Sequence, residues 1–182
     1  CWRLCCQLAR RGQTVRLWVD DASALRWMAP QGHPGVTVHA WTQPLNLQGI
    51  TPGEVLVEAF GCEVAPEFVA AFASSYKPKA WINLEYLSAE PYVTRSHGLP
   101  SPVMSGPGKG LTKHFFYPGF TPETGGLLRE TNLLDKQQAF DTHDWLQSQG
   151  VQPVAGAQRI SMFCYESPAL SALLDQRQAA AQ

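Results

Sequence analysis

A strand-like run of apolar residues ends in carboxylates within residues 82–102. This segment reads INLEYLSAEPYVTRSHGLPSP, so Glu85 and Glu90 follow the apolar start and His97 precedes turns rich in Gly and Pro. Loops that leave the carboxyl ends of strands in open α/β sheets carry the ligand groups of such domains. Glu85 can therefore face a ligand, or it can brace the loop as a hydrogen-bonded carboxylate. His97 is more typical of a turn residue than of a base.

The Gly-Gly pair of TGGLLRE, Gly125 and Gly126, is a second candidate. Backbone N–H groups ahead of a short helical pattern can bind an anion such as a pyrophosphate. The alternative is a flexible loop near a cleft, with Arg129 and Glu130 solvated. The spacing alone is compatible with both interpretations.

The five cysteines do not form a recognisable framework. Three of them crowd the start of the chain at positions 1, 5 and 6, and Cys62 and Cys164 stand alone in apolar stretches. An odd, clustered set argues against a secreted disulfide scaffold. No histidine completes a metal-ligand spacing with Cys1 and Cys5, so the pattern favours buried thiols and predicts no metal site.

Composition and charge exclude several classes of partner. The net charge is −1 and only 16% of the 182 residues are charged, so no basic field favours nucleic acid or an anionic membrane. No apolar run reaches the roughly 18 residues of a membrane-spanning helix, and no secretory signal opens the sequence. These features predict a cytoplasmic protein with a small, specific partner.

The elements that would position the candidates alternate between strand and helix. Apolar residues at helical spacing end at Arg10, Arg11 and Gly12, and TVRLWV follows as a strand, so the sequence begins inside a βαβ unit whose first strand is missing. The nearly continuous apolar run EVLVEAFG suits the buried middle of a parallel sheet. Strands are predicted at 14–19, 35–41, 54–61, 80–87 and 158–166, and helices at 66–76, 141–150 and 167–182, with a loop-rich tract at 88–130.

This order predicts an α/β fold built on a Rossmann-like parallel sheet with right-handed crossovers. Residues 1–150 would form one Rossmann-like domain. Residues 151–182 would begin a second one, because a fresh strand and helix follow a long connection.

Seven strings of the sequence resemble, in order, the elongation factor P arginine rhamnosyltransferase family (EarP). They are CWRL, VRLWVDD, EAFGCE, WINLEYLSAE, HGLPSP, FFYPGFTPETGGLLRE and MFCYESPAL. The resemblance implies the N-terminal half of a two-domain GT-B glycosyltransferase, incomplete here. The family moves L-rhamnose from dTDP-β-L-rhamnose to one arginine of elongation factor P, with inversion and without a metal or cofactor.

The resemblance also implies which residues act. The family's Asp-Asn-Tyr/Phe-Gly-Asp turn, which supplies the catalytic carboxylates, would precede CWRL, so no catalytic residue is expected in this chain. Asp20 and Asp21 belong to a different loop. Phe163 and Tyr165 match an aromatic pair that holds the donor nucleotide sugar, and their alternation places both on one strand face.

Two alternatives stay open at this stage. Phe163 and Tyr165 can instead be ordinary core aromatics of a half-buried strand. The whole chain can also be a noncatalytic Rossmann-like module that binds a protein partner or a nucleotide.

Overall fold

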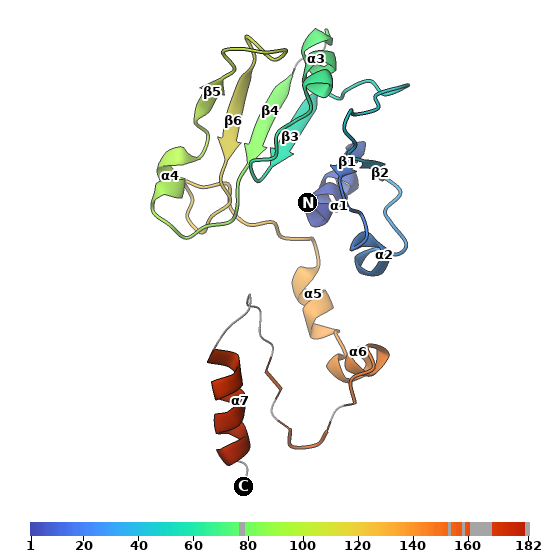
Figure 1. Ribbon diagram of the computed structural model, residues 1–182, viewed down its shortest axis with the longest axis vertical. Coiled ribbons are helices and arrows are strands. Elements are labelled where there is room, and N and C mark those ends of the chain that lie inside the picture. The colour runs from blue at the N-terminus through green and yellow to red at the C-terminus, as the bar shows by residue number, and fades with distance from the viewer. Residues whose placement is uncertain (77–78, 153, 158, 161–168, 181–182) are drawn as a thin grey trace. The chain divides into compact units, whose positions relative to one another are not determined.

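The computed structural model describes residues 1–76, 79–152, 154–157, 159–160 and 169–180 (Figure 1). It divides into two compact units, residues 1–133 and 134–182. Each unit is described by itself. The predicted domain boundary at residue 150 stays a prediction.

The first unit carries the sheets. Its elements are α1 (Trp2–Arg10), β1 (Val15–Val19), α2 (Leu25–Met28), β2 (Val36–Ala40), β3 (Val55–Ala59), α3 (Pro66–Ser74), β4 (Ala80–Leu84), α4 (Tyr92–Ser96), β5 (Pro100–Pro102) and β6 (Thr112–Phe116). Three further helices follow: α5 (Leu133–Gln138), α6 (Thr142–Ser148) and α7 (Ala169–Ala180).

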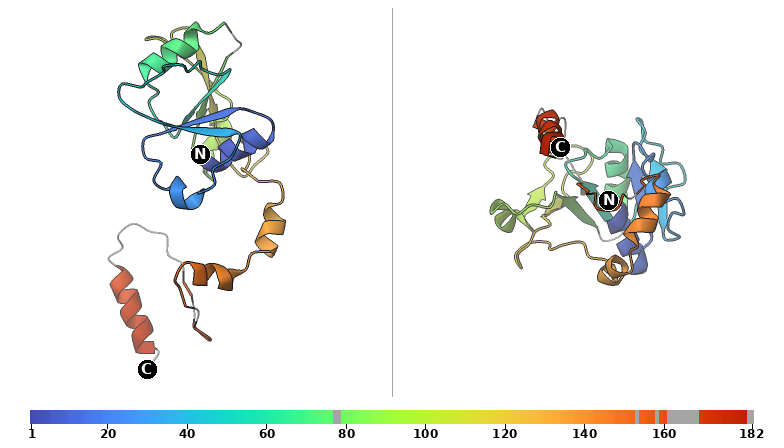
Figure 2. Two further views of the ribbon diagram at one scale, coloured as in Figure 1. Left: turned by 90° about the vertical axis from the view of Figure 1, so that its right-hand side faces the viewer. Right: turned by 90° about the horizontal axis from the view of Figure 1, so that it is seen from below.

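The strands form two sheets that are mostly parallel. In the smaller one, β1 and β2 pair in parallel, and α1 packs beside them (Figure 2). The larger sheet has the order β3-β4-β6-β5, in which only β5 runs antiparallel to its neighbour. The predicted α/β class with parallel-dominated pairing is therefore confirmed, although the strands are divided between two sheets.

The two sheets of the first unit share one core. The ring of Trp18 on β1 meets the edge of Phe68 on α3 at 5.9 Å between centroids. No backbone ladder joins β1 to β3 among the described residues, and Figure 1 shows the small sheet beside the β3 edge. The prediction of a fully buried middle strand at 54–61 is wrong here. Val55 is 57% exposed, because α3 covers only the opposite face, where Leu56 packs.

Helix α3 anchors the core of the larger sheet. Pro66 occupies its first turn, where a missing N–H costs nothing, as the sequence predicts. Phe68, Val69 and Phe72 then lie on the buried face of the helix. Phe72 is 1% exposed and its ring meets Trp81 of β4 edge-on. Trp81 therefore lies on the face of the sheet that α3 covers, and the polar residues described below lie on the same face.

The tract at 88–130 is more ordered than predicted. It contains α4, β5 and β6, and β6 supplies the third parallel strand of the larger sheet. The sequence of β6, TKHFF, has neither an alternation of polar and apolar residues nor a run of β-branched residues, so it gives a weak strand signal. Strand β5 is Pro-Ser-Pro, a composition that sheets accept only at an edge.

The remaining expectations concern the second unit. Asp141 caps α6 as predicted, since its side chain accepts bonds from the N–H groups of His143 and Asp144. Helix α7 confirms the predicted terminal helix, whereas most of the predicted strand at 158–166 lies outside the described residues. Within the described part of the chain, the helices are all too short or too polar to cross a membrane.

Candidate functional site

One face of the larger sheet carries a row of polar side chains at its carboxyl end. The parallel register sets Glu58 of β3 opposite Asn83 of β4, and Asn83 opposite Phe115 of β6. The backbone N–H of Glu85 donates to the carbonyl of Phe116 at 2.9 Å, which continues the register just past the end of β4. Because side chains two residues apart share a face, Glu85 follows Asn83 on this face. The strand ends at Leu84, so Glu85 is the first residue after it, close to the predicted position.

Glu58 is buried and fully partnered. Its carboxylate accepts bonds from Lys113 Nζ at 2.8 and 2.9 Å and from the indole N–H of Trp81 at 3.0 Å. The Lys113 ammonium also lies 4.4 Å from the centre of the Trp81 ring. This network ties three adjacent strands together and leaves no oxygen of Glu58 for a ligand.

Asn83 and Glu85 form a second, less satisfied pair. Asn83 is 7% exposed and donates from Nδ2 to Glu85 Oε1 at 3.0 Å. Its Oδ1 is buried and has no hydrogen-bond partner among the described residues. Glu85 is half-buried. The bracing interpretation thus accounts for Oε1 of Glu85, whereas the described residues place no hydrogen-bond donor at Oε2.

Aromatic rings border this pair. Burial, together with the negative charge of Glu85, raises the pKa of Tyr117 above its usual value of 10.0, with a smaller contribution from Tyr92. The ring of Tyr92 meets Tyr117 edge-on at 5.7 Å, and Phe115 stacks on Tyr117 at 6.0 Å. His97 Nδ1 accepts the Tyr117 backbone N–H at 3.1 Å, which agrees with its predicted role as a turn residue.

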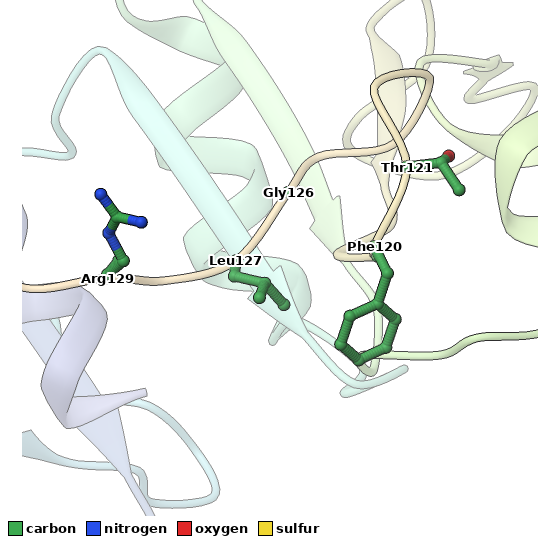
Figure 3. Close-up of a pocket in the computed structure, with 6 residues that line it drawn as sticks. Phe120, Thr121, Gly126, Leu127 and Arg129 are labelled. Atoms are coloured by element: carbon green, nitrogen blue, oxygen red, sulfur yellow. The ribbon is translucent and has the colours of Figure 1, made fainter.

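The Gly-Gly pair lies in the loop that follows β6. Gly125 N–H donates to the carbonyl of Tyr117 at 2.8 Å, and Gly126 N–H points to Thr124 Oγ1 at 3.4 Å. In this conformation an anion could bind the Gly126 N–H only by replacing its weak hydrogen bond to Thr124 Oγ1. Gly126 has a φ of +69°, a conformation that favours glycine. A cavity of about 340 Å³ adjoins it, lined by Gly119, Phe120, Thr121, Gly126, Leu127 and Arg129, with the larger side chains spaced along the loop (Figure 3).

Gly125 is required for packing. A Cβ added there would lie 2.4 Å from Cε1 of Phe116, far inside van der Waals contact. We expect Gly125→Ala to lower the free energy of unfolding by about 1–3 kcal/mol, because the ring or the loop must move. Urea unfolding measures this change. Gly53→Ala is the matched control, since its nearest added contact is an ordinary 3.7 Å to Arg16, and equal losses in the two variants would contradict the expectation.

The same loop is tied to the first turn of α1. Arg3 Nε donates to Glu130 Oε1 at 2.5 Å and Arg3 Nη2 to Oε2 at 2.7 Å, a two-pronged contact. Hydrogen bonding to Arg3 lowers the pKa of Glu130 to about 2, and Glu130 is only 16% exposed. The alternative in which Glu130 is solvated is therefore wrong, because Arg3, 127 positions earlier in the sequence, binds its carboxylate.

This ion pair predicts an acid-sensitive contribution to stability. The folded-state pKa of Glu130 lies below its ordinary value of 4.5, so its charge stabilises the fold above about pH 4.5. That contribution is lost as the pH falls from about 4.5 to about 2. We expect Glu130→Gln to lose less stability than the parent protein over this range, as measured by urea midpoints. The exposed Glu123→Gln should follow the parent curve, and a parallel shift of both variants would contradict the assignment.

Several residues of this site were missed by sequence reasoning. Asn83 could have been found, since it shares a strand face with Glu85, but Lys113 and Tyr117 fell in a tract predicted as loop. The exposed rings of Phe60 and Tyr86 stack at 4.3 Å, just past the ends of β3 and β4. Phe60 has a φ of +61°, a strained conformation that no sequence signal announces.

Two further sequence predictions concern an aromatic pair and the cysteines. Phe163 and Tyr165 lie outside the described residues. Cys5 is buried as predicted, whereas Cys1 and Cys62 are exposed, so the prediction of buried thiols is wrong for these two. Within the described ranges, no three His, Cys, Asp or Glu side chains gather in a way that could hold a metal ion.

Comparisons with known proteins agree with one another. The family described as Elongation-Factor P (EF-P) rhamnosyltransferase EarP matches residues 1–182. Relatives named protein-arginine rhamnosyltransferase occur in Pseudomonas putida (44% identity, covering 96% of this chain and 48% of the relative), Pseudomonas aeruginosa (40%, 100% and 50%) and Shewanella oneidensis (39%, 100% and 50%). The chain thus spans about half the length of these curated relatives, and their names do not favour a noncatalytic module. The chain belongs to the EarP family of elongation factor P rhamnosyltransferases.

Proposed function

We propose that the polypeptide containing this chain is a protein-arginine rhamnosyltransferase that modifies elongation factor P. The observation that carries the proposal is the EarP match along all 182 residues. The parallel sheet supports it, because its carboxyl edge carries the half-buried Glu85. Residues 1–182 would form the N-terminal Rossmann-like half of a GT-B enzyme and the start of its second half.

The proposed reaction is a single displacement with inversion. A guanidinium nitrogen of the acceptor arginine attacks C1 of L-rhamnose in dTDP-β-L-rhamnose. The C1–O bond to the diphosphate breaks, dTDP leaves, and the nitrogen loses a proton. A guanidinium is protonated at cellular pH and its lone pairs are delocalised, so carboxylates must orient it and assist the loss of that proton. The reaction needs no metal ion and no organic cofactor.

The proposed partners follow from this chemistry. They are a nucleotide-sugar donor and elongation factor P as the protein acceptor, without nucleic acid or membrane. Because elongation factor P acts on ribosomes, the proposed location is the cytoplasm.

A mass measurement tests the proposal. The full-length protein is incubated with dTDP-β-L-rhamnose and elongation factor P, and the acceptor should gain the mass of one deoxyhexose. An acceptor whose modified arginine is replaced by lysine should gain nothing. If the Pseudomonas aeruginosa relative modifies its acceptor in a parallel reaction while this protein leaves every acceptor unchanged, the proposal is wrong.

Phe163 and Tyr165 remain proposed donor contacts. If Tyr165 contacts the nucleotide sugar, Tyr165→Ala in the full-length protein should weaken donor binding by about 2- to 12-fold. This range corresponds to a lost contact of roughly 0.5–1.5 kcal/mol. Calorimetry measures donor affinity, and the melting temperature should barely change. Unchanged affinity with a large fall in melting temperature would assign Tyr165 to the core instead.

A further inference from the structure

Glu85 is a half-buried carboxylate with no cationic partner among the described residues. The ion pairs within the described residues join Arg3 to Glu130 and Lys113 to Glu58, and neither includes Glu85. Its described side-chain partner is the neutral Nδ2 of Asn83, which reaches Oε1. Partial burial weakens solvent screening, so a cation bound at Glu85 interacts more strongly there than it would at a fully exposed carboxylate.

Asn83 supplies an independent sign of an unfilled polar site. It is more than nine-tenths buried, yet its Oδ1 has no donor among the described residues. Most buried side-chain polar atoms in folded proteins have a partner. The Asn83 amide next to Glu85 therefore lacks one hydrogen bond among the described residues. Both oxygens of the neighbouring Glu58, in contrast, accept hydrogen bonds.

The aromatic residues near Glu85 narrow the choice of cation. Tyr117 follows Phe115 on the same face and is close enough for the charge of Glu85 to act on it, and Tyr92 lies edge-on to Tyr117. A guanidinium is planar, donates up to five hydrogen bonds, binds a carboxylate through two of them and stacks on aromatic rings. A lysine ammonium offers a point charge without the flat face.

We propose that Glu85 and Tyr117 bind the guanidinium of the acceptor arginine, with Asn83 as the positioning residue that orients Glu85. This inference rests on the proposed function and deepens it. Glu85 receives two N–H bonds from the guanidinium, the Tyr117 ring covers one side of it, and the arginine nitrogen is held before it attacks the sugar. Glu85 thereby contributes to the selection of arginine over lysine.

A double-mutant cycle on binding tests the proposal without requiring turnover. Calorimetry measures the affinity of the full-length protein and its Glu85→Gln variant for elongation factor P, with the acceptor arginine intact or replaced by alanine. Gln keeps an oxygen for the Asn83 bond and removes only the charge. We expect Glu85→Gln to weaken binding of the intact acceptor by roughly 10- to 100-fold, the scale of a charge-assisted hydrogen bond. It should scarcely affect binding of the alanine acceptor.

Two further readouts separate ligand contact from a structural role. Glu85→Gln should raise KM for elongation factor P while leaving KM for dTDP-β-L-rhamnose and the melting temperature nearly unchanged. Glu90→Gln, on the same loop and exposed, is the matched control and should behave as the parent protein.

The outcomes are distinct. Coupling between Glu85 and the acceptor arginine supports the inference. If the effects of Glu85→Gln and of the arginine-to-alanine change in the acceptor simply add, in a protein that still modifies its acceptor, the inference is wrong and the proposed function stands. A parent protein that neither binds nor modifies elongation factor P removes the proposed function, and the inference falls with it.

Discussion

Replacing Phe72 by alanine is expected to lower the free energy of unfolding by about 3–5 kcal/mol. Phe72 is 1% exposed and sits where α3 meets β4. Its removal deletes the buried ring and leaves a cavity that the surrounding strands cannot fully close. Since a domain of this size is stable by only about 5–15 kcal/mol, the change is a large fraction of the total.

Urea unfolding followed by circular dichroism measures the effect. Phe120→Ala is the control of the same chemistry, because Phe120 is 62% exposed and should cost well under 1 kcal/mol. Phe72→Leu keeps most of the volume and should fall between the two. A cost of less than about 1 kcal/mol for Phe72→Ala would mean that this part of the core is not packed as described.

The strands and helices that the sequence predicted are those whose signals are local. Strands β1 to β4 show alternating or continuous apolar runs, and α3 begins with Pro66, so each can be recognised from its own residues. Strand β6 was missed because its stability comes from outside its own sequence. Lys113 is tolerated inside the sheet only because Glu58, 55 residues earlier, neutralises it.

The same distinction applies to the candidate site. Glu85 could be located from its position near the carboxyl end of a predicted strand, and the structure places it directly after that strand. Its surroundings could not be predicted, because Tyr117 follows a strand, and its neighbour Tyr92 lies on a helix, that the sequence did not reveal. The sequence of the Gly-Gly loop is compatible with an anion site or with a flexible segment. The close approach of Gly125 to the ring of Phe116 arises only in the folded structure and has no sequence signature.

Replacing Lys113 by methionine is expected to destabilise the protein by roughly 3 kcal/mol. The change removes one partner of a buried ion pair and leaves the Glu58 carboxylate, 6% exposed, without its cation. It also removes the contact of the ammonium with the Trp81 ring. The value lies at the lower end of the range for broken buried pairs, because the Lys113 side chain is itself 28% exposed.

The complementary change should cost less, and this asymmetry is the sharper test. Glu58→Gln retains an oxygen for the Trp81 indole, and Lys113 can turn toward solvent. The double variant Glu58→Gln with Lys113→Met should recover part of the loss of Lys113→Met, since no buried charge remains. Lys109→Met, at an exposed position, controls for the loss of a positive charge. If Lys113→Met and Lys109→Met have equal urea midpoints, the pair is a surface contact and Glu58 needs no cation to stay in the sheet.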